Sequence, residues 1–304
     1  MKRKYYSFLF VGVLSFVFQI NLFAQKIIWE EVGTIPQPLF GGISVKLDTC
    51  VYLIGGQTGN MTGRLKTIYE YNFSNNTWIE QDTMQTEKLG FVAAQANNKI
   101  YAIRKNINEE YDPTTNRWTT KTPIPEDNVH LTGGSINNKI YVVNTNNWVY
   151  DPIKDTWEKF ASMISQISGT SVVAGDKLYI IGGLSNNNSC DHVEMYDPIT
   201  NKWEKKTDLP VPLFASTVVY IKGKIIVIGG ETVPWPNTEM EITNNVFMYD
   251  IKKDKWTQLN NFVCPTNWSA ATVHNNFIYV FGGANDKYEP YGKVWRGKLY
   301  LDTK

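Results

Sequence analysis

The sequence LYIIGG at residues 178–183, followed by YDPITNKW at residues 196–203, holds the pattern that decides the fold. An apolar strand runs into a Gly-Gly pair, and a later strand ends in Tyr196 before an Asp-Pro turn. Asp caps such a turn with its side chain and Pro presets its φ, so the turn is tight. Trp203 then opens the next strand. The stretch therefore predicts consecutive short antiparallel strands.

The same pattern recurs along the chain. Short turns rich in Asn and Gly precede the apolar strands, and these residues tolerate the positive φ that two-residue hairpins require. Each unit therefore predicts four antiparallel strands, named a to d in chain order. We expect structural roles for the aromatic residues, which would pack between units, and for the glycines, which would let backbones crowd. The recurring residues are Trp29, Trp78, Trp118, Trp157, Trp203 and Trp256, with Gly55, Gly56, Gly182, Gly183, Gly229, Gly230, Gly282 and Gly283.

Gly-Gly after strand b, Tyr before the c–d turn and Trp at strand d together resemble the Kelch repeat. The resemblance covers essentially all of the chain after residue 24. It implies an all-β fold, a β-propeller in which each repeat forms one four-stranded blade. Two repeats depart from the motif, because Arg104-Lys105 and Asn144-Thr145 replace Gly-Gly.

The number of blades depends on how the ring closes. The last repeat, residues 269–301, has strands a, b and c but no strand d, whereas residues 27–31 form a strand d without a repeat. Pairing the two completes a sixth blade and leaves no exposed edge at the seam. We therefore expect a six-bladed β-propeller closed by its N-terminal strand.

The N-terminus predicts export from the cytoplasm. Lys2, Arg3 and Lys4 precede an apolar run at residues 8–18, and a small residue, Ala24, follows at the expected cut. We interpret residues 1–24 as a signal peptide and residues 25–304 as the propeller, secreted or periplasmic. An uncleaved membrane anchor is the alternative, although the apolar run is short for a span. After cleavage no membrane span is expected.

Charge and cysteine content exclude several classes of protein. With 30 Lys and Arg against 29 Asp and Glu, the chain lacks the basic excess typical of nucleic-acid binding. Cys50, Cys190 and Cys264 are too few for a disulfide framework, although one bridge is possible. The three His residues show no metal-ligand spacing. We therefore expect no metal and no cofactor, and a monomeric chain.

Binding residues are expected in the b–c and d–a loops, which share one face of a propeller. Variable loops on a rigid scaffold are common sites of recognition. The longest, residues 231–245, carries a Trp between two prolines that either faces solvent or folds back onto its loop. Aromatic residues without a repeat role, and the cations nearest the channel mouth, are the candidates. They are Trp235, Trp268, Tyr288, Tyr291, Arg64 and Arg104.

Two functions compete for this face. One is a non-catalytic module that binds a protein or carbohydrate, since the sequence contains no catalytic motif. The other is a sugar mutarotase, because signal-bearing six-bladed Kelch propellers resemble the N-acetylneuraminate epimerases. That family uses Arg and Glu near the channel mouth, whereas the strand a starts of this chain carry no Arg. His130 lies near Glu126 and Asp127, where it serves either acid–base chemistry or a solvated loop.

Overall fold

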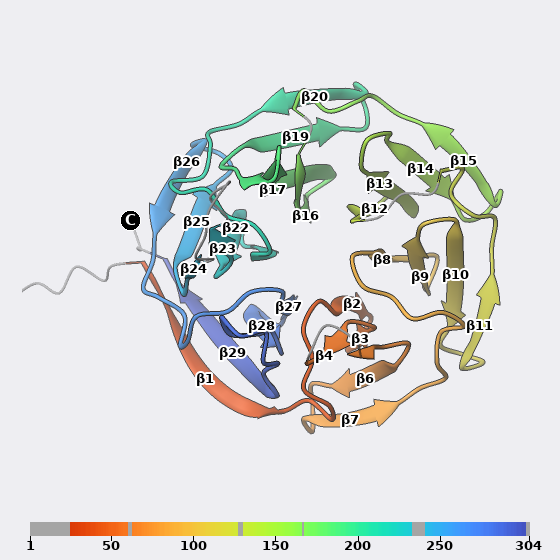
Figure 1. Cartoon of the computed structure of the whole chain (residues 1–304), viewed down its shortest axis with the longest axis horizontal. Helices are drawn as coiled ribbons and strands as arrows, with labels where there is room; N and C mark the ends of the chain where they lie inside the picture. Colours follow the sequence, from red (N-terminus) through yellow and green to blue (C-terminus); the bar gives the residue numbers. More distant parts are fainter. Residues whose placement is uncertain (1–24, 60–62, 127–129, 166, 233–240, 302–304) are drawn as a thin grey trace, which may run out of the picture.

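Six antiparallel sheets stand as blades around a central axis (Figure 1). The computed structural model describes residues 25–59, 63–126, 130–165, 167–232 and 241–301, and these contain strands and no helix. The expected six-bladed fold is confirmed. The expected signal peptide, residues 1–24, and Trp235 lie outside the described residues.

In blades 1 to 5 the strands follow the chain from the axis outwards, and in blade 6 the outermost strand is β1. Blade 1 contains β2 (Ile43–Leu47), β3 (Cys50–Ile54), β6 (Ile68–Asn72) and β7 (Thr77–Glu80). Blade 2 contains β8 (Val92–Ala96), β9 (Lys99–Arg104), β10 (Ile107–Asp112) and β11 (Arg117–Thr120). Blade 3 contains β12 (Thr132–Ile136), β13 (Lys139–Val143), β14 (Trp148–Asp151) and β15 (Thr156–Lys159). Blade 4 contains β16 (Ser168–Ala174), β17 (Lys177–Ser185), β19 (Val193–Asp197) and β20 (Lys202–Lys205). Blade 5 contains β21 (Thr217–Ile221), β22 (Lys224–Ile228), β25 (Val246–Asp250) and β26 (Lys255–Gln258). Blade 6 contains β27 (Ala270–His274), β28 (Phe277–Phe281), β29 (Lys293–Tyr300) and β1 (Lys26–Thr34). Short strands extend three b–c loops: β4 (Gln57–Thr58), β5 (Gly63–Arg64), β18 (Asn188–Ser189), β23 (Glu231–Thr232) and β24 (Glu241–Ile242).

The core is divided into clusters that fill the spaces between neighbouring blades. Successive side chains of a strand point to opposite faces of its sheet, so a middle strand serves two clusters. In β22, Ile225 and Val227 pack towards blade 4, whereas Ile226 and Ile228 pack towards blade 6. This is why strand b reads as an unbroken apolar run in the sequence.

The N-terminal strand closes the ring as expected. β1 pairs antiparallel with β29 along its whole length, from Lys26 opposite Tyr300 to Thr34 opposite Lys293. The side chain of Asn260, in the connection between blades 5 and 6, bonds both the amide and the carbonyl of Ile27 at 2.8 Å. Blade 6 therefore combines the two ends of the chain (Figure 1).

The repeated Tyr and Trp bond to the connection that arrives from the preceding blade. In blade 2, the Tyr111 hydroxyl donates to the Asn116 side chain at 2.9 Å, and the Asp82 amide donates to the same oxygen at 2.9 Å. The Trp118 indole donates to the Asp82 carbonyl at 2.7 Å. We call these bonds the Tyr–Asx–Trp set. It recurs in blades 3 to 5 through Tyr150, Asp155 and Trp157; Tyr196, Asn201 and Trp203; and Tyr249, Asp254 and Trp256.

The set is incomplete at the seam. Tyr71 donates to Asn76 at 2.7 Å in blade 1, but the indole nitrogens of Trp29 and Trp78 have no hydrogen-bond partner among the described residues. Trp29 instead packs edge-on against Phe262, with ring centroids 4.8 Å apart. Packing rather than hydrogen bonding therefore fixes the Trp residues on either side of the seam.

The Gly-Gly pairs bring the backbones of neighbouring blades into close contact on the loop face. The second glycine donates its amide to the connector of the next blade, as from Gly183 to the Leu213 carbonyl at 2.7 Å and from Gly230 to the Thr266 carbonyl at 2.8 Å. The first glycine has a positive φ, for example 56° at Gly182, where a Cβ would lie 2.4 Å from the Leu213 oxygen. A left-handed conformation and this crowding both demand glycine.

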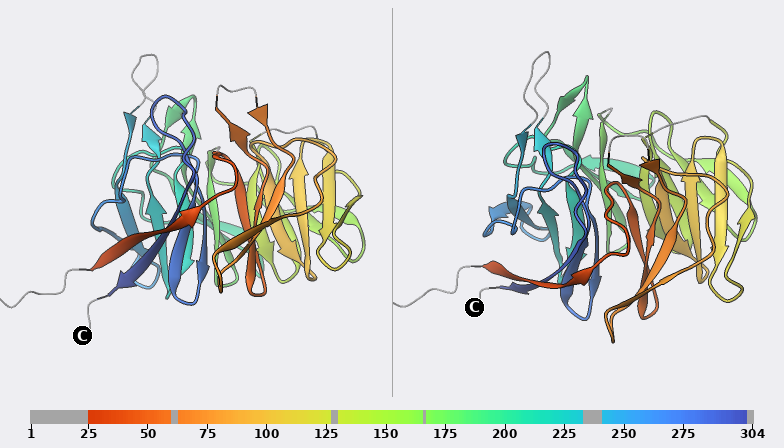
Figure 2. Two further views of the ribbon diagram at one scale, coloured as in Figure 1. Left: turned by 90° about the horizontal axis from the view of Figure 1, so that it is seen from below. Right: turned by 60° about the horizontal axis from the view of Figure 1, so that its bottom comes forward.

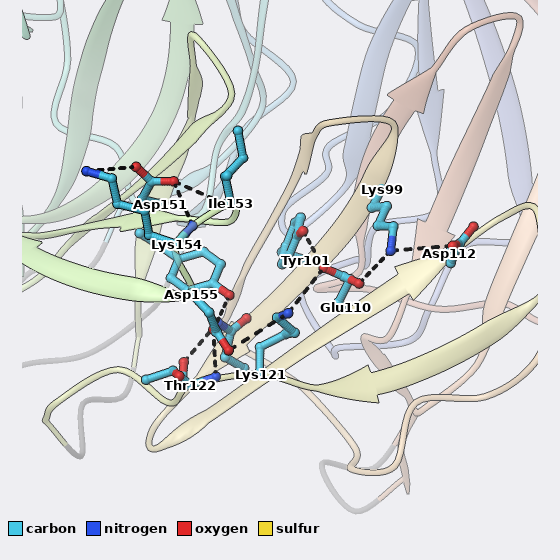
Figure 3. Close-up of polar contacts among 12 residues, drawn as sticks. Lys99, Tyr101, Glu110, Asp112, Lys121, Thr122, Asp151, Ile153, Lys154 and Asp155 are labelled. Carbon is cyan, nitrogen blue, oxygen red and sulfur yellow. Dashed lines mark hydrogen bonds and ion pairs between the residues drawn. The ribbon is translucent and has the colours of Figure 1, made fainter.

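Ion pairs join strands b and c at the opposite face. The first Lys of strand b contacts the Asp of the Tyr-Asp turn, as in Lys177–Asp197 at 2.5 Å and Lys224–Asp250 at 2.7 Å. In blade 2 the network is larger (Figure 3): Lys99 contacts both Asp112 and Glu110, and Lys121 links Glu110 to Asp155 of blade 3. These pairs are partly exposed, so each stabilises the fold only weakly.

Candidate functional site at the channel mouth

The b–c and d–a loops lie on one face of the ring, as the topology predicts. The ribbons β4–β5 and β23–β24 rise from this same face (Figure 2). The short a–b and c–d turns occupy the other face. Side chains that surround the axis on the first face form the mouth of the central channel.

A ring of left-handed residues surrounds this mouth. In five blades the d–a connector has a residue with positive φ beside the start of strand a: Gly41 at 67°, Gly90 at 63°, His130 at 55°, Ala215 at 54° and Trp268 at 52°. The Trp268 amide donates to the Ala215 carbonyl at 2.9 Å, and the Gly41 amide donates to the Trp268 carbonyl at 2.7 Å. The backbone around blades 5, 6 and 1 is therefore held by a chain of hydrogen bonds.

Aromatic side chains from three blades form two ring pairs on the loop face, and one of these pairs lines the mouth cavity. Trp268 and Phe214 meet edge to face, with ring centroids 5.1 Å apart, and both line a cavity of about 160 Å³. Tyr288 packs against Phe40, with centroids 5.9 Å apart, and burial raises the pKa of its hydroxyl to about 12. We define Phe40, Phe214, Trp268 and Tyr288 as the aromatic rim.

The other predicted site residues have different environments. The Tyr291 hydroxyl donates to the Pro265 carbonyl at 3.0 Å, so it holds its own loop to the blade 6 connector. Arg104 donates through Nε to the Leu89 carbonyl at 2.6 Å, which gives it a structural contact. Arg64 lies exposed in β5. Of the predicted residues, Trp268 and Tyr288 both contact the blade 1 connector, Trp268 at Gly41 and Tyr288 at Phe40.

A buried acid–amide pair lies beside the rim. Asn267 donates through Nδ2 to Glu231 Oε2 at 2.7 Å, and the two residues are 0% and 2% exposed. Burial raises the pKa of Glu231, and the Asn267 hydrogen bond opposes that rise. Glu231 also exchanges both backbone hydrogen bonds with Phe214 at 2.8 Å. The sequence signal was a carboxylate directly after Gly-Gly, where the other Gly-Gly blades carry Gln57, Leu184 and Ala284.

The raised pKa of Glu231 makes a pH-dependent prediction. A folded-state pKa above the unfolded value means that the stabilisation is complete below the unfolded pKa and is lost as the pH rises through the folded pKa. Glu231→Gln, which stays neutral, should therefore gain stability relative to the natural protein as the pH rises from about 4 to 7. Urea unfolding at a series of pH values measures the difference. Parallel stability profiles would contradict the burial argument.

The channel below the mouth is lined by small side chains from the inner strands. It holds a cavity of about 280 Å³. Hydroxyl groups there bond to neighbouring blades, as from Thr217 to the Ser269 carbonyl at 2.8 Å and from Ser44 to the Ala271 carbonyl at 2.7 Å. These hydroxyls hold neighbouring blades together.

The described residues contain no cluster of metal ligands and no membrane-spanning helix. Within the described ranges, no group of three or more His, Cys, Asp or Glu side chains lies close enough to hold a metal ion. The cysteines Cys50, Cys190 and Cys264 are unpaired. Among the described residues there is no helix with the length and hydropathy needed to cross a membrane.

Known proteins share the repeat and the fold. The KLHDC2/KLHL20/DRC7 Kelch-repeats domain matches residues 120–301, and the Kelch motif matches residues 44–85. Beta-scruin of Limulus polyphemus is 32% identical over 132 residues, which are 42% of this chain and 14% of that protein. Kelch-like protein 25 of Xenopus tropicalis is 22% identical over 290 residues, which are 92% of this chain and 44% of that protein.

The solved structure of YjhT superposes with a TM-score of 0.78 at 14% identity, covering 90% of this chain and 99% of that one. At this identity the likeness shows the fold alone. This chain spans less than half the length of the curated relatives described above. The repeat motif, the closed ring of six blades and the match over residues 120–301 agree, and the chain therefore belongs to the Kelch-repeat family.

Proposed function

We propose that this chain is a secreted, non-catalytic binding module that acts as a monomer and takes a protein or carbohydrate ligand at the aromatic rim. Kelch propellers are typically protein-interaction modules, which supports the general function. The predicted signal peptide supports a site of action outside the cytoplasm, secreted or periplasmic. The aromatic rim supports the location of the ligand.

The observation that carries the proposal is the backbone conformation of Trp268. The equivalent ring position is Gly41, Gly90 or Ala215 in three other blades, so the fold itself needs no large side chain there. A left-handed conformation is strained for a bulky residue, and such strain is concentrated at functional sites. Trp268 also stays only half-buried. A partly exposed aromatic side chain in a strained backbone position is explained by a ligand that covers it.

The mutarotase alternative receives less support from the mouth. Exchange of sugar anomers by acid–base chemistry needs positioned proton donors and acceptors. Among the described residues that line the mouth cavity, His130 is the only titratable side chain. Arg104 already bonds the Leu89 carbonyl, and Glu231 is buried against Asn267. The lining is therefore better suited to binding than to proton transfer.

Replacement of Trp268 tests this function. Trp268→Ala should weaken ligand binding at least tenfold, on the scale of a central aromatic contact, without loss of stability. The measurement is affinity by calorimetry, first against a panel of sugars and then against extracellular proteins. Tyr220→Ala is the matched control, because Tyr220 is an aromatic of blade 5 that is 36% exposed on the opposite face. Equal affinity for both variants would refute a ligand at the rim.

A further inference from the structure

A second cleft opens beside the mouth, between blades 3 and 4. Its volume is about 260 Å³. The minimal b–c turn of blade 3 supplies Asn144 and Thr145, and the connector to blade 4 supplies Ser162, Met163 and Ser165. The brevity of the blade 3 turn leaves this side of the mouth open, whereas the ribbons of blades 1 and 5 rise from the same face (Figure 2).

The cleft is lined by uncharged polar side chains and by apolar side chains. Hydroxyl and amide side chains can each donate or accept hydrogen bonds. The apolar members of the lining are Val143, Met163, Ile167 and Leu184. Apart from His130, no titratable side chain occurs among the described residues that line it. A ligand with many hydroxyls and no net charge matches this chemistry.

The wall of the cleft is held by a buried carboxylate. Glu194, which is 1% exposed, accepts the Ser165 amide at 2.6 Å and the Ile164 amide at 2.9 Å. Ile167 is buried in the cluster between blades 3 and 4. Ile164 and Ser165 are therefore held in place before any ligand arrives, and a preformed site costs less ordering entropy on binding.

The cleft and the mouth cavity share two lining residues, His130 and Ser168. The left-handed φ of 55° places His130 between the two hollows, and Asn144 donates to its carbonyl at 3.4 Å. At the far side of the mouth cavity lie Trp268 and Phe214. The two cavities thus adjoin along a path from the cleft to the aromatic rim.

We propose that the blade 3–4 cleft and the mouth cavity are two adjoining subsites for a neutral carbohydrate of at least two sugar units. One sugar contacts Trp268 and Phe214 at the mouth, and the next contacts the hydroxyl and amide groups of the cleft. An acidic sugar would find no Arg or Lys among the described lining residues of either cavity to pair with its charge. This inference rests on the proposed binding function and specifies the class of its ligand.

Dependence on chain length tests the two subsites. The probes are glucose, galactose, mannose and N-acetylglucosamine, with their disaccharides, and N-acetylneuraminate as the anion. Calorimetry should show at least tenfold tighter binding of one disaccharide than of its monosaccharide. Ser162 lines the cleft and does not line the mouth cavity, so the bulkier Ser162→Phe should remove this gain and leave the monosaccharide affinity unchanged. Ser74→Phe, at an exposed turn of blade 1, is the matched control and should keep the gain.

The outcomes separate this inference from the function on which it rests. Equal affinity for mono- and disaccharides, a gain that survives Ser162→Phe, or tighter binding of N-acetylneuraminate would overturn the subsites. No binding of any neutral sugar would also overturn them, and a protein ligand sensitive to Trp268→Ala would then still support the binding function. Ligand binding that Trp268→Ala leaves unchanged would instead refute the rim itself.

Discussion

Loss of the N-terminal strand should lower the free energy of unfolding by several kcal/mol, because β1 joins the two ends of the chain in one blade. A protein that begins at Thr34 loses the pairing of β1 with β29 and the buried Ile27, which is 1% exposed. Burial of one such side chain alone contributes about 1.5–3 kcal/mol. Urea unfolding compares this protein with one that begins at Gln25. The truncated protein should also associate through the exposed edge of β29.

Two neighbouring isoleucines of β1 test whether the strand stabilises the ring through its buried side chains. Ile27 lies in the core cluster between blades 5 and 6, whereas Ile28 is 51% exposed. Ile27→Ala should cost about 2–4 kcal/mol and Ile28→Ala should cost little. Equal stability of the proteins that begin at Gln25 and Thr34 would show that β1 does not close the ring.

Gly229→Ala should destabilise the protein by about 3 kcal/mol or more. Gly229 has a φ of 63°, and an added Cβ would lie 2.2 Å from the Thr266 carbonyl oxygen of blade 6. That oxygen already accepts the Gly230 amide at 2.8 Å, so it cannot move without breaking the contact between the blades. The left-handed conformation alone costs an alanine about 1–2 kcal/mol, and the clash adds to this cost. Thermal or urea unfolding measures the loss.

Gly223→Ala in the same blade is the control that separates the cost of the steric clash from the cost of the left-handed backbone. Gly223 has a φ of 75°, but no atom lies within 4 Å of an added Cβ. It should therefore show only the backbone cost of about 1–2 kcal/mol. If the two alanine variants are equally stable, the Gly-Gly pair does not mediate close packing between blades.

The fold could be predicted because the same local sequence features recur along the chain, each of them tied to a particular strand or turn of a blade. The unbroken apolar run of β22 reflects a strand with a blade on each side, and the Tyr-Asp turns reflect c–d hairpins. Even blades 2 and 3, which lack Gly-Gly, keep the Tyr and Trp of the set. The closure was predictable because an incomplete last repeat and an isolated first strand complement each other.

The candidate site was less predictable because it depends on contacts between blades. The sequence predicts Trp268 as a site residue because it has no role in the repeat. Its left-handed backbone and its hydrogen bond with Gly41, however, depend on how the connectors meet around the ring. The sequence predicts Arg104 as a ligand contact, yet its Nε donates to the Leu89 carbonyl in the connector that enters blade 2. The carboxylate of Glu231 directly after Gly-Gly is visible in the sequence, but its partner Asn267 lies 36 positions away and no local motif identifies it.

An Asn or Asp follows each motif Tyr by five residues, and the sequence alone does not indicate its role. Its function requires the preceding blade, since Asn116 accepts both the Tyr111 hydroxyl and the Asp82 amide. Its positive φ, 54° at Asn116, also explains the residue type, because Asn and Asp tolerate the left-handed region better than other residues with a side chain. The role of this Asn or Asp therefore follows from the contact between blades in the folded ring and could not be predicted from the repeat alone.

The most direct test of the binding account is an NMR titration that resolves the indole N–H signals of the ten Trp residues. With the disaccharide of highest affinity, the Trp268 signal should shift, and the signals of Trp118 and Trp203, which hydrogen-bond between blades, should stay in place. Shifts confined to indoles away from the mouth, with an unchanged Trp268 signal under saturating ligand, would contradict the account.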